Sequence, residues 1–173
     1  MELQEIYTAH HKMVYNLALS YVQNIEDAEE ITQDVFVAVH QSLSTFQEKS
    51  SLTTWMYRIT INKSLDFIKA KKSKKRFAFL TTLFYPETNE AREELGHFNH
   101  PGVLMEQKES LKNIFDAINE LPPNQKTALI LSKLECKSQL EIGEIMDLSS
   151  KAVESLVQRA KSNLLKKLNQ TKD

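Results

Sequence analysis

The sequence predicts an all-α protein: two small helical domains joined by a flexible linker, the second containing a helix-turn-helix. Three observations lead to this fold class. Only three glycines and four prolines occur in 173 residues, and the abundance of Ala, Leu, Glu, Lys and Gln favours helix. Apolar residues recur at steps of three and four in both halves. Residues 77–109, between the halves, lose this periodicity and contain Pro86, Gly96 and Pro101.

The first domain, residues 1–76, is predicted to contain three helices. Apolar stripes mark two of them: Ile6, Met13, Val14, Leu17 and Tyr21 in residues 2–22, and Ala28, Ile31, Val35, Val39 and Leu43 in the next. Asn24 suits the N-cap of the second helix, because its side chain can accept a hydrogen bond from the first turn. Residues 44–51 are polar, and Ser50 or Ser51 is the expected cap of a third helix that ends at about Lys72.

The linker, residues 77–109, is expected to hold one short helical piece at 77–84. Four helices are predicted in the second domain, residues 110–173. The first begins near Ser110, and Leu121-Pro122-Pro123 ends it and starts the next, since proline suits a first helical turn. That next helix continues through Leu129, Ile130 and Leu134. The last two helices are expected at 138–146 and 150–168.

Residues 138–155 have the spacing of a helix-turn-helix. Gly143 is small where two helices must approach closely, Asp147 tolerates the left-handed backbone of the turn, and Ser149 can cap the second helix. An ordinary helical hairpin with a solvated face has similar spacing, but six basic and two acidic residues in 150–173 favour DNA binding. We expect these side chains to pack inside the motif: Leu140, Ile142, Ile145, Leu148 and Val153.

The net charge of −1 conceals a strong segregation. Residues 1–48 carry eight acids and one base, whereas 55–76 carry eight bases and one acid. Together with the basic carboxyl end, this indicates two contacts with a polyanion. Six of the bases lie within Lys69–Arg76, and we expect that run to fray unless phosphates neutralise it. Phe46, Trp55 and Tyr57 lie among cations, which suits single-stranded DNA, although periodicity alone favours a core position for Trp55.

The sequence lacks the patterns of an enzyme or a cofactor site. It has no Gly-rich phosphate loop, Gly-x-Ser-x-Gly elbow or Cys-x-x-Cys pair. His97 and His100 have a metal-compatible spacing that nothing nearby completes. The single Cys136 excludes an intramolecular disulfide and favours the cytoplasm; we expect it to act as a small apolar residue. Neither a signal peptide nor a membrane-spanning run is evident.

In combination, these segments resemble one known family, the extracytoplasmic-function (ECF) sigma factors. Residues 27–36, residues 46–59 and the stretch from Asn62 to the basic run are similar to region 2 of that family. Residues 121–125 and the helix-turn-helix are similar to region 4. The matches occur in family order and cover most of residues 1–168. Leu156 and Cys136 depart from the family, which often has arginine and glycine at these positions.

The resemblance implies three binding surfaces on a dissociable subunit of bacterial RNA polymerase. The polymerase would be bound at its β′ clamp helices by Glu30, Gln33 and Asp34, and its β flap is a second expected contact. The single-stranded −10 element would meet Phe46, Ser51, Thr54, Trp55, Arg58, Asn62 and Lys63. The duplex −35 element would meet Lys151, Glu154, Ser155, Gln158 and Arg159.

The family also implies an inhibitory anti-sigma factor as a partner. We hypothesise that the free chain binds promoter DNA poorly, because its two domains pack together and mask both DNA surfaces. Two other hypotheses remain: a helix-turn-helix regulator that is not a polymerase subunit, and a protein-binding adaptor such as an anti-factor. A regulator has no need of the ordered acidic helix, aromatic loop and basic run in the first half, and an adaptor predicts no salt-sensitive retention on DNA.

Overall fold

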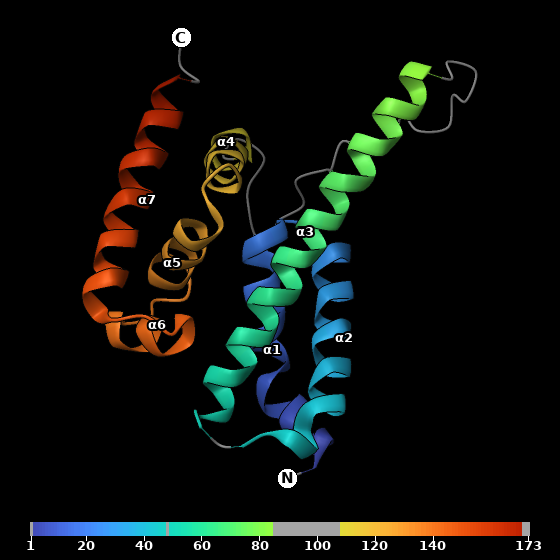
Figure 1. Ribbon diagram of the computed structural model, residues 1–173, viewed down its shortest axis with the longest axis vertical. Coiled ribbons are helices and arrows are strands. Elements are labelled where there is room, and N and C mark those ends of the chain that lie inside the picture. Colours follow the sequence, from blue (N-terminus) through green and yellow to red (C-terminus); the bar gives the residue numbers. More distant parts are fainter. Residues whose placement is uncertain (1, 48, 85–107, 171–173) are drawn as a thin grey trace.

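The computed structural model describes residues 2–47, 49–84 and 108–170, and every regular element in these ranges is helical, which confirms the all-α class. Two groups of helices lie side by side, α1 to α3 and α4 to α7 (Figure 1). The elements are α1 (Leu3–Val22), α2 (Ile25–Ser42), the 3₁₀ turn η1 (Leu43–Thr45), α3 (Leu52–Phe84), α4 (Lys108–Asn119), α5 (Pro123–Lys133), α6 (Gln139–Met146) and α7 (Ser150–Gln170).

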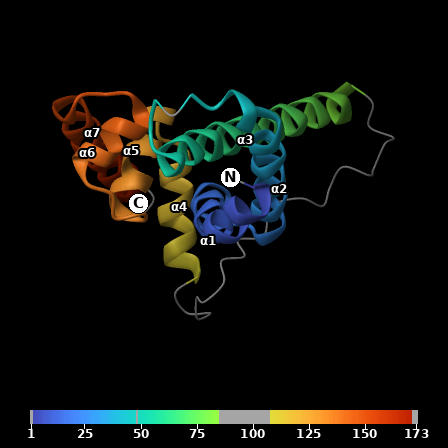
Figure 2. The ribbon, with the colours of Figure 1, turned by 90° about the horizontal axis from the view of Figure 1, so that it is seen from below.

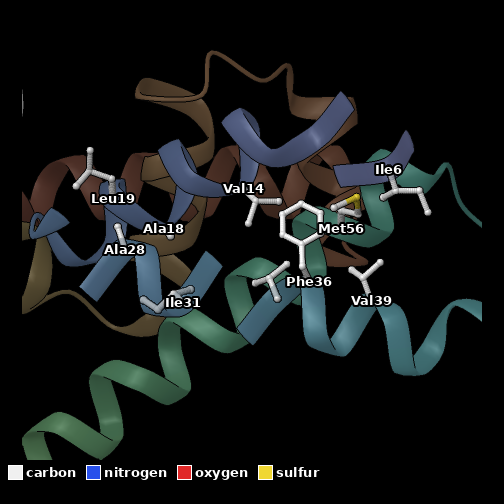
Figure 3. Packing of buried hydrophobic residues seen from close by; sticks show 10 residues of the cluster. Ile6, Val14, Ala18, Leu19, Ala28, Ile31, Phe36, Val39 and Met56 are labelled. Carbon is white, nitrogen blue, oxygen red and sulfur yellow. The ribbon is translucent and has the colours of Figure 1, made fainter. Parts of the chain in front are cut away.

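The first three helices enclose a core made from the apolar stripes that the sequence predicts. Figure 3 shows its buried residues, which come from α1, α2 and α3 and include Val14, Ile31 and Met56. Asn24 caps α2 as expected, since its Oδ1 accepts from the amide of Asp27 at 2.9 Å. The bundle therefore begins its second helix at the predicted residue.

Helix α3 is longer than the sequence analysis predicts. It continues without a break to Phe84, so the expected end near Lys72 and the separate piece at 77–84 are wrong. The described helix passes through the basic run, so its backbone is helical there. Lys71 in this run bonds to Asp27 of α2, with 2.7 Å between Nζ and Oδ2. Asp27 thus neutralises part of the positive charge of the run.

The histidine pair with metal-compatible spacing, His97 and His100, lies outside the described residues.

Helices α4 to α7 form a second core. Pro123 begins α5 at its first turn, as predicted. The sequence predicts that α5 continues through Leu134, but the helix ends at Lys133. Because Leu134 lies beyond the last helical residue, its side chain is not directed into the core and is 43% exposed. The buried residues of this core are Phe115, Ile118, Leu121, Leu129 and Ala160.

The two groups of helices pack directly on each other. A single apolar cluster joins Leu17 and Tyr57 of the first group to Ile130 and Val153 of the second. In Figure 2, the first part of α3 lies alongside the α5–α6 side of the second group. We call this packing the closed arrangement. Among the described residues, we find no helix with the length and apolar character that a membrane crossing requires.

Hydrogen bonds from buried polar groups fix the closed arrangement. The Tyr21 hydroxyl donates to Thr127 Oγ1 at 2.7 Å, and Tyr57 donates to Glu135 Oε2 at 3.1 Å. Burial raises the pKa of both tyrosines well above the ordinary value, so both hydroxyls remain protonated donors. Lys126 is only 3% exposed. Its Nζ donates to Asn119 Oδ1 at 2.6 Å and to the Tyr21 carbonyl at 3.2 Å.

Candidate nucleic-acid interface

Helices α6 and α7 meet in the tight turn that the sequence predicts. Asp147 has φ 56° and ψ 51°, the left-handed conformation expected there. Ser138 caps α6 in a capping box with Glu141, and Ser149 Oγ accepts from the amide of Ala152 at 3.2 Å. The pair of helices is therefore held at both starts and at the turn between them.

Gly143 is required by the turn backbone. A Cβ at this position would lie 2.6 Å from the carbonyl oxygen of Leu148, closer than van der Waals contact allows. The sequence analysis correctly predicts a small residue here, but it attributes the need to a close approach of two helices. The close neighbour is instead the backbone of the turn that leads from α6 to α7.

Two leucines predicted to lie inside the motif are exposed. Leu140 is 67% exposed and Leu148 is 37% exposed, whereas Ile142, Ile145 and Val153 are buried as expected. The error at Leu140 is one of helical phase. Ile142 lies about 200° around the helix axis from it, so a helix that buries Ile142 directs Leu140 to solvent.

The outer face of α7 carries all five residues predicted for duplex DNA. They are exposed, and their steps of three and four place them on one side of the helix. Val153 and Ala160 occupy the buried side. Arg159 is positioned by Ser155, whose Oγ accepts from its Nη2 at 2.8 Å. The exposed face combines Lys151, Glu154, Ser155, Gln158 and Arg159.

The structure brings together four of the residues predicted for single-stranded DNA. The rings of Phe46 and Trp55 have centroids 4.8 Å apart, and Trp55 also packs against the first core, as periodicity favours. Ser51 is the cap of α3, accepting from the amide of Thr54 at 3.1 Å. Thr54 is itself buried, so its hydroxyl serves this cap by accepting from Ser51. An aromatic pair thus stands next to the start of α3.

The remaining three predicted residues lie farther along α3. Arg58 and Asn62 line a cleft with Asp147 of the second group, and Lys63 is half-buried. The Arg58 guanidinium donates to the carbonyls of Ile145, at 3.1 Å, and of Glu144, at 2.6 Å. The expected masking of both DNA surfaces is therefore only partly correct: Arg58 is occupied, while the α7 face stays open.

The three residues predicted to bind polymerase lie together on α2. Glu30, Gln33 and Asp34 are all exposed, on the side of the helix opposite its buried stripe. Sequence reasoning missed a groove of about 660 Å³ beside them, between α1 and α2. Tyr7 and Phe36 form part of its wall, with ring centroids 4.7 Å apart. Tyr7, His11 and Tyr15, which are spaced four residues apart outside the buried stripe of α1, were the available signal.

Comparison with known proteins places both halves in one family. A family model of Sigma-70 region 2 matches residues 6–74, and one of Sigma-70, region 4 matches residues 111–164. The ECF RNA polymerase sigma factor SigW of Bacillus subtilis is 27% identical over 163 residues, 90% of this chain and 82% of that protein. The chain belongs to the ECF sigma factors. The ECF sigma-E factor of Escherichia coli K12 is 28% identical to this ECF sigma factor over 151 residues, 87% of this chain and 78% of that protein.

Solved structures of sigma factors share the fold of this ECF sigma factor. CnrH, in complex with the cytosolic domain of CnrY, matches with a TM-score of 0.65 and 20% identity over 97% of this chain and 88% of CnrH. RpoE from Bartonella quintana, in complex with the anti-sigma factor NepR, matches with a TM-score of 0.63 and 18% identity over 96% of each chain. Because both regions match in family order, the hypothesis of a helix-turn-helix regulator that is not a polymerase subunit is not favoured.

Proposed function

We propose that this ECF sigma factor divides initiation among three surfaces. The acidic outer face of α2, with Glu30, Gln33 and Asp34, binds the basic β′ clamp helices of core RNA polymerase. The groove walled by Tyr7 and Phe36 extends this surface with apolar contact area. The functional units are residues 1–76, the linker 77–109 and residues 110–173, and the third unit also contacts the β flap.

The −10 element binds the first unit as a single strand. The Phe46–Trp55 pair offers ring faces for an unstacked base, and base–aromatic stacking contributes about 1–3 kcal/mol per base. Unstacking and unpairing the base costs a few kcal/mol, so stacking alone offsets only part of that cost. Polar and cationic side chains hold the adjoining strand: Ser51, Thr54, Arg58, Asn62 and Lys63.

The open face of α7 is the observation that carries the proposal. The predicted contact residues of α7 lie on one exposed side of the helix, and further basic residues follow them toward its end. Such a helix fits the major groove of the −35 duplex. Lys151, Gln158 and Arg159 can donate to base edges or phosphates, while Glu154 can accept from a cytosine amino group. Ser155 holds the Arg159 guanidinium in place before DNA arrives.

An anti-sigma factor is the proposed inhibitor, acting on the closed arrangement. Arg58 cannot reach DNA while it bonds to α6, so the first unit must separate from the second before it binds the −10 element. A partner that contacts both units would oppose that separation. Sigma factors of the same fold occur in complexes with anti-sigma factors, and we infer that this chain works in the cytoplasm, where core polymerase meets the chromosome.

Transcription in vitro with purified core polymerase tests the proposal. A pool of genomic promoter fragments should give new transcripts only when the protein is added. The variant Glu30→Ala/Gln33→Ala/Asp34→Ala should lose core binding, measured by co-sedimentation, yet keep its affinity for duplex DNA. The variant Lys151→Ala/Arg159→Ala should keep core binding and lose promoter recognition.

Matched surface variants control for loss of charge alone. Glu26→Ala removes an acid from the first turn of α2 outside the groove lining, and Lys12→Ala/Lys133→Ala removes two exposed lysines outside the predicted contacts. Both controls should transcribe as the unaltered protein does. Identical defects in the two test variants, or transcripts that do not depend on the protein, would reject the proposed division.

A further inference from the structure

A cleft of about 410 Å³ lies where the end of α1, the start of α2, the middle of α3 and helix α4 meet. None of the individual residues assigned above to the −10 element, the −35 element or polymerase lines it, although Lys71, Lys72 and Lys75 belong to the basic run at 69–76. Its volume is in the range typical of small-molecule sites. Because α3 belongs to the first group of helices and α4 to the second, the cleft exists only in the closed arrangement.

Four lysines surround this cleft: Lys71, Lys72 and Lys75 from α3, and Lys112 from α4. Lys71 is paired with Asp27. Lys72, Lys75 and Lys112 make no ion pair with any residue that the structure describes, and Asp116 is the other carboxylate in the lining. Lysines without counter-charges around a concave surface attract anions.

The positive potential reaches neighbouring groups. Burial is the main cause that lowers the pKa of Lys126 to about 8, and repulsion from Lys72 lowers it further. The nearby carboxyl of Glu120 has a pKa below its usual value, chiefly because it bonds to Lys167, with a smaller contribution from Lys72. An anion bound beside Lys72 would relieve the repulsion that Lys126 experiences.

Apolar side chains and amides also line the cleft. Val22, Phe67 and Ile68 contribute apolar surface. Gln23 and Asn119 are joined by a 3.0 Å hydrogen bond from Asn119 Nδ2 to Gln23 Oε1. A ligand with a flat ring and linked phosphates matches both the apolar residues and the lysines of this cleft. Its ring can cover the apolar surface, and its phosphates can contact the ammonium groups.

We propose that this cleft binds a free nucleoside di- or triphosphate. The phosphates contact Lys72, Lys75 and Lys112, and the base lies against the apolar surface. Duplex DNA fits less well, because a duplex along α3 would meet the α3 lysines but leave the apolar lining residues and Lys112 without contacts. A ligand held by α3 and α4 together stabilises the closed arrangement, which makes this a regulatory site separate from the proposed promoter contacts.

Titration calorimetry on the full chain tests the site, with ATP and GTP as probes. At least one should bind with a dissociation constant below one millimolar and raise the thermal unfolding temperature. Lys72→Gln/Lys112→Gln should weaken binding about tenfold or more, while Lys133→Gln, an exposed lysine outside the cleft, should bind as the unaltered protein does. Circular dichroism checks that each variant is folded. Absence of binding at millimolar nucleotide, or equal binding by both variants, would overturn the proposal.

Three further probes identify the ligand chemistry. An uncharged nucleoside should bind much more weakly than the triphosphate, and pyrophosphate should bind more weakly than the triphosphate. Equal affinity for pyrophosphate would overturn the assignment of the base to the apolar surface. A short duplex should not compete with nucleotide; competition that is lost in Lys72→Gln/Lys112→Gln would assign the lysines to DNA and overturn the nucleotide site. None of these outcomes depends on transcription activity.

Discussion

The Arg58 guanidinium donates from Nε to the main-chain carbonyl of Ile145, 87 residues later in the chain, at 3.1 Å. That carbonyl belongs to the last turn of α6, where the helix dipole favours a positive charge. The same guanidinium is proposed to contact the −10 strand. One cation therefore has two competing partners, and closing the protein must oppose binding of the melted promoter.

Weakening the closed arrangement should accordingly favour −10 binding. Tyr21→Phe removes the hydroxyl that donates to Thr127 across the interface and touches none of the predicted DNA contacts. A hydrogen bond of this kind contributes about 1 kcal/mol, so the open fraction should rise about fivefold. Fluorescence energy transfer between dyes on the exposed Cys136 and on an introduced Gln41→Cys should decrease, and affinity for a single-stranded −10 oligonucleotide should increase.

Tyr15→Phe is a matched control within the same helix, since Tyr15 lies outside the interface cluster. It should leave both energy transfer and oligonucleotide affinity unchanged. If Tyr21→Phe opens the protein without improving −10 binding, Arg58 is not the group that links the two processes.

The turn between α6 and α7 should not tolerate a side chain at position 143. In Gly143→Ala, the new methyl group meets the Leu148 carbonyl at 2.6 Å. Crowding of this kind costs about 1–3 kcal/mol, partly offset by the better helix propensity of alanine, about 1 kcal/mol. Urea unfolding should show a net loss of stability, and duplex affinity should decrease because the orientation of α7 changes.

Glu144→Ala alters the adjacent, exposed residue and should change stability by less than about 0.5 kcal/mol. A Gly143→Ala protein with unchanged stability and full duplex affinity would mean that the turn adapts freely to the added methyl group.

The loop before α6 holds a residue in an unfavourable backbone conformation. Cys136 has φ 52° and is exposed, contrary to the expectation of a small apolar role, and this is a position where the family often has glycine. A left-handed conformation costs an ordinary L-residue roughly 1–2 kcal/mol, and glycine loses up to about 1 kcal/mol more entropy on folding. Cys136→Gly should therefore stabilise the protein by about 0.5–1 kcal/mol in urea unfolding.

Asp147→Gly provides the comparison, because Asp147 has a similar φ of 56°. Aspartate tolerates this conformation better than cysteine, so the gain should be smaller at position 147. A larger gain at 147 than at 136 would reject backbone strain as the reason for the family's glycine.

The caps and stripes of the fold could be predicted from sequence because they depend on neighbouring residues. Asn24, Ser51 and Pro123 each act on a helix start within three residues of themselves, and their side chains are sufficient to specify it. The length of α3 could not be predicted in this way. Its basic run repels itself locally, and the compensating Asp27 is 44 residues away on another helix.

In the candidate site, too, features set by neighbouring residues could be predicted, whereas features set by the packing of distant helices could not. Exposure of the α7 face follows from helical period alone, and the structure agrees at all five positions. The engagement of Arg58 depends on how two separate helical groups pack, for which the sequence offers no local signal. The groove beside Gln33 was missed for a related reason, because its walls come from two helices whose facing positions are known only after they pack.

Stability should rise with pH in the mildly alkaline range because of Lys126. Burial lowers the pKa of this amine in the folded protein to about 8, whereas in the unfolded chain it is near 10.4. Between these values the unfolded state binds more protons, so the free energy of unfolding increases with pH. The expected gain between about pH 8 and pH 9.5 is about 1.5 kcal/mol, measured by urea unfolding at each pH.

The upper limit of this window is set by the buried tyrosines. Burial raises the pKa values of Tyr21 and Tyr57, so above about pH 10 the unfolded chain loses protons that the folded protein keeps, and stability falls. Lys126→Met removes the titrating group and should abolish the gain below pH 10, whereas Lys133→Met, at an exposed position of the same helix, should retain it. The same pH dependence in both variants would assign the proton to another group.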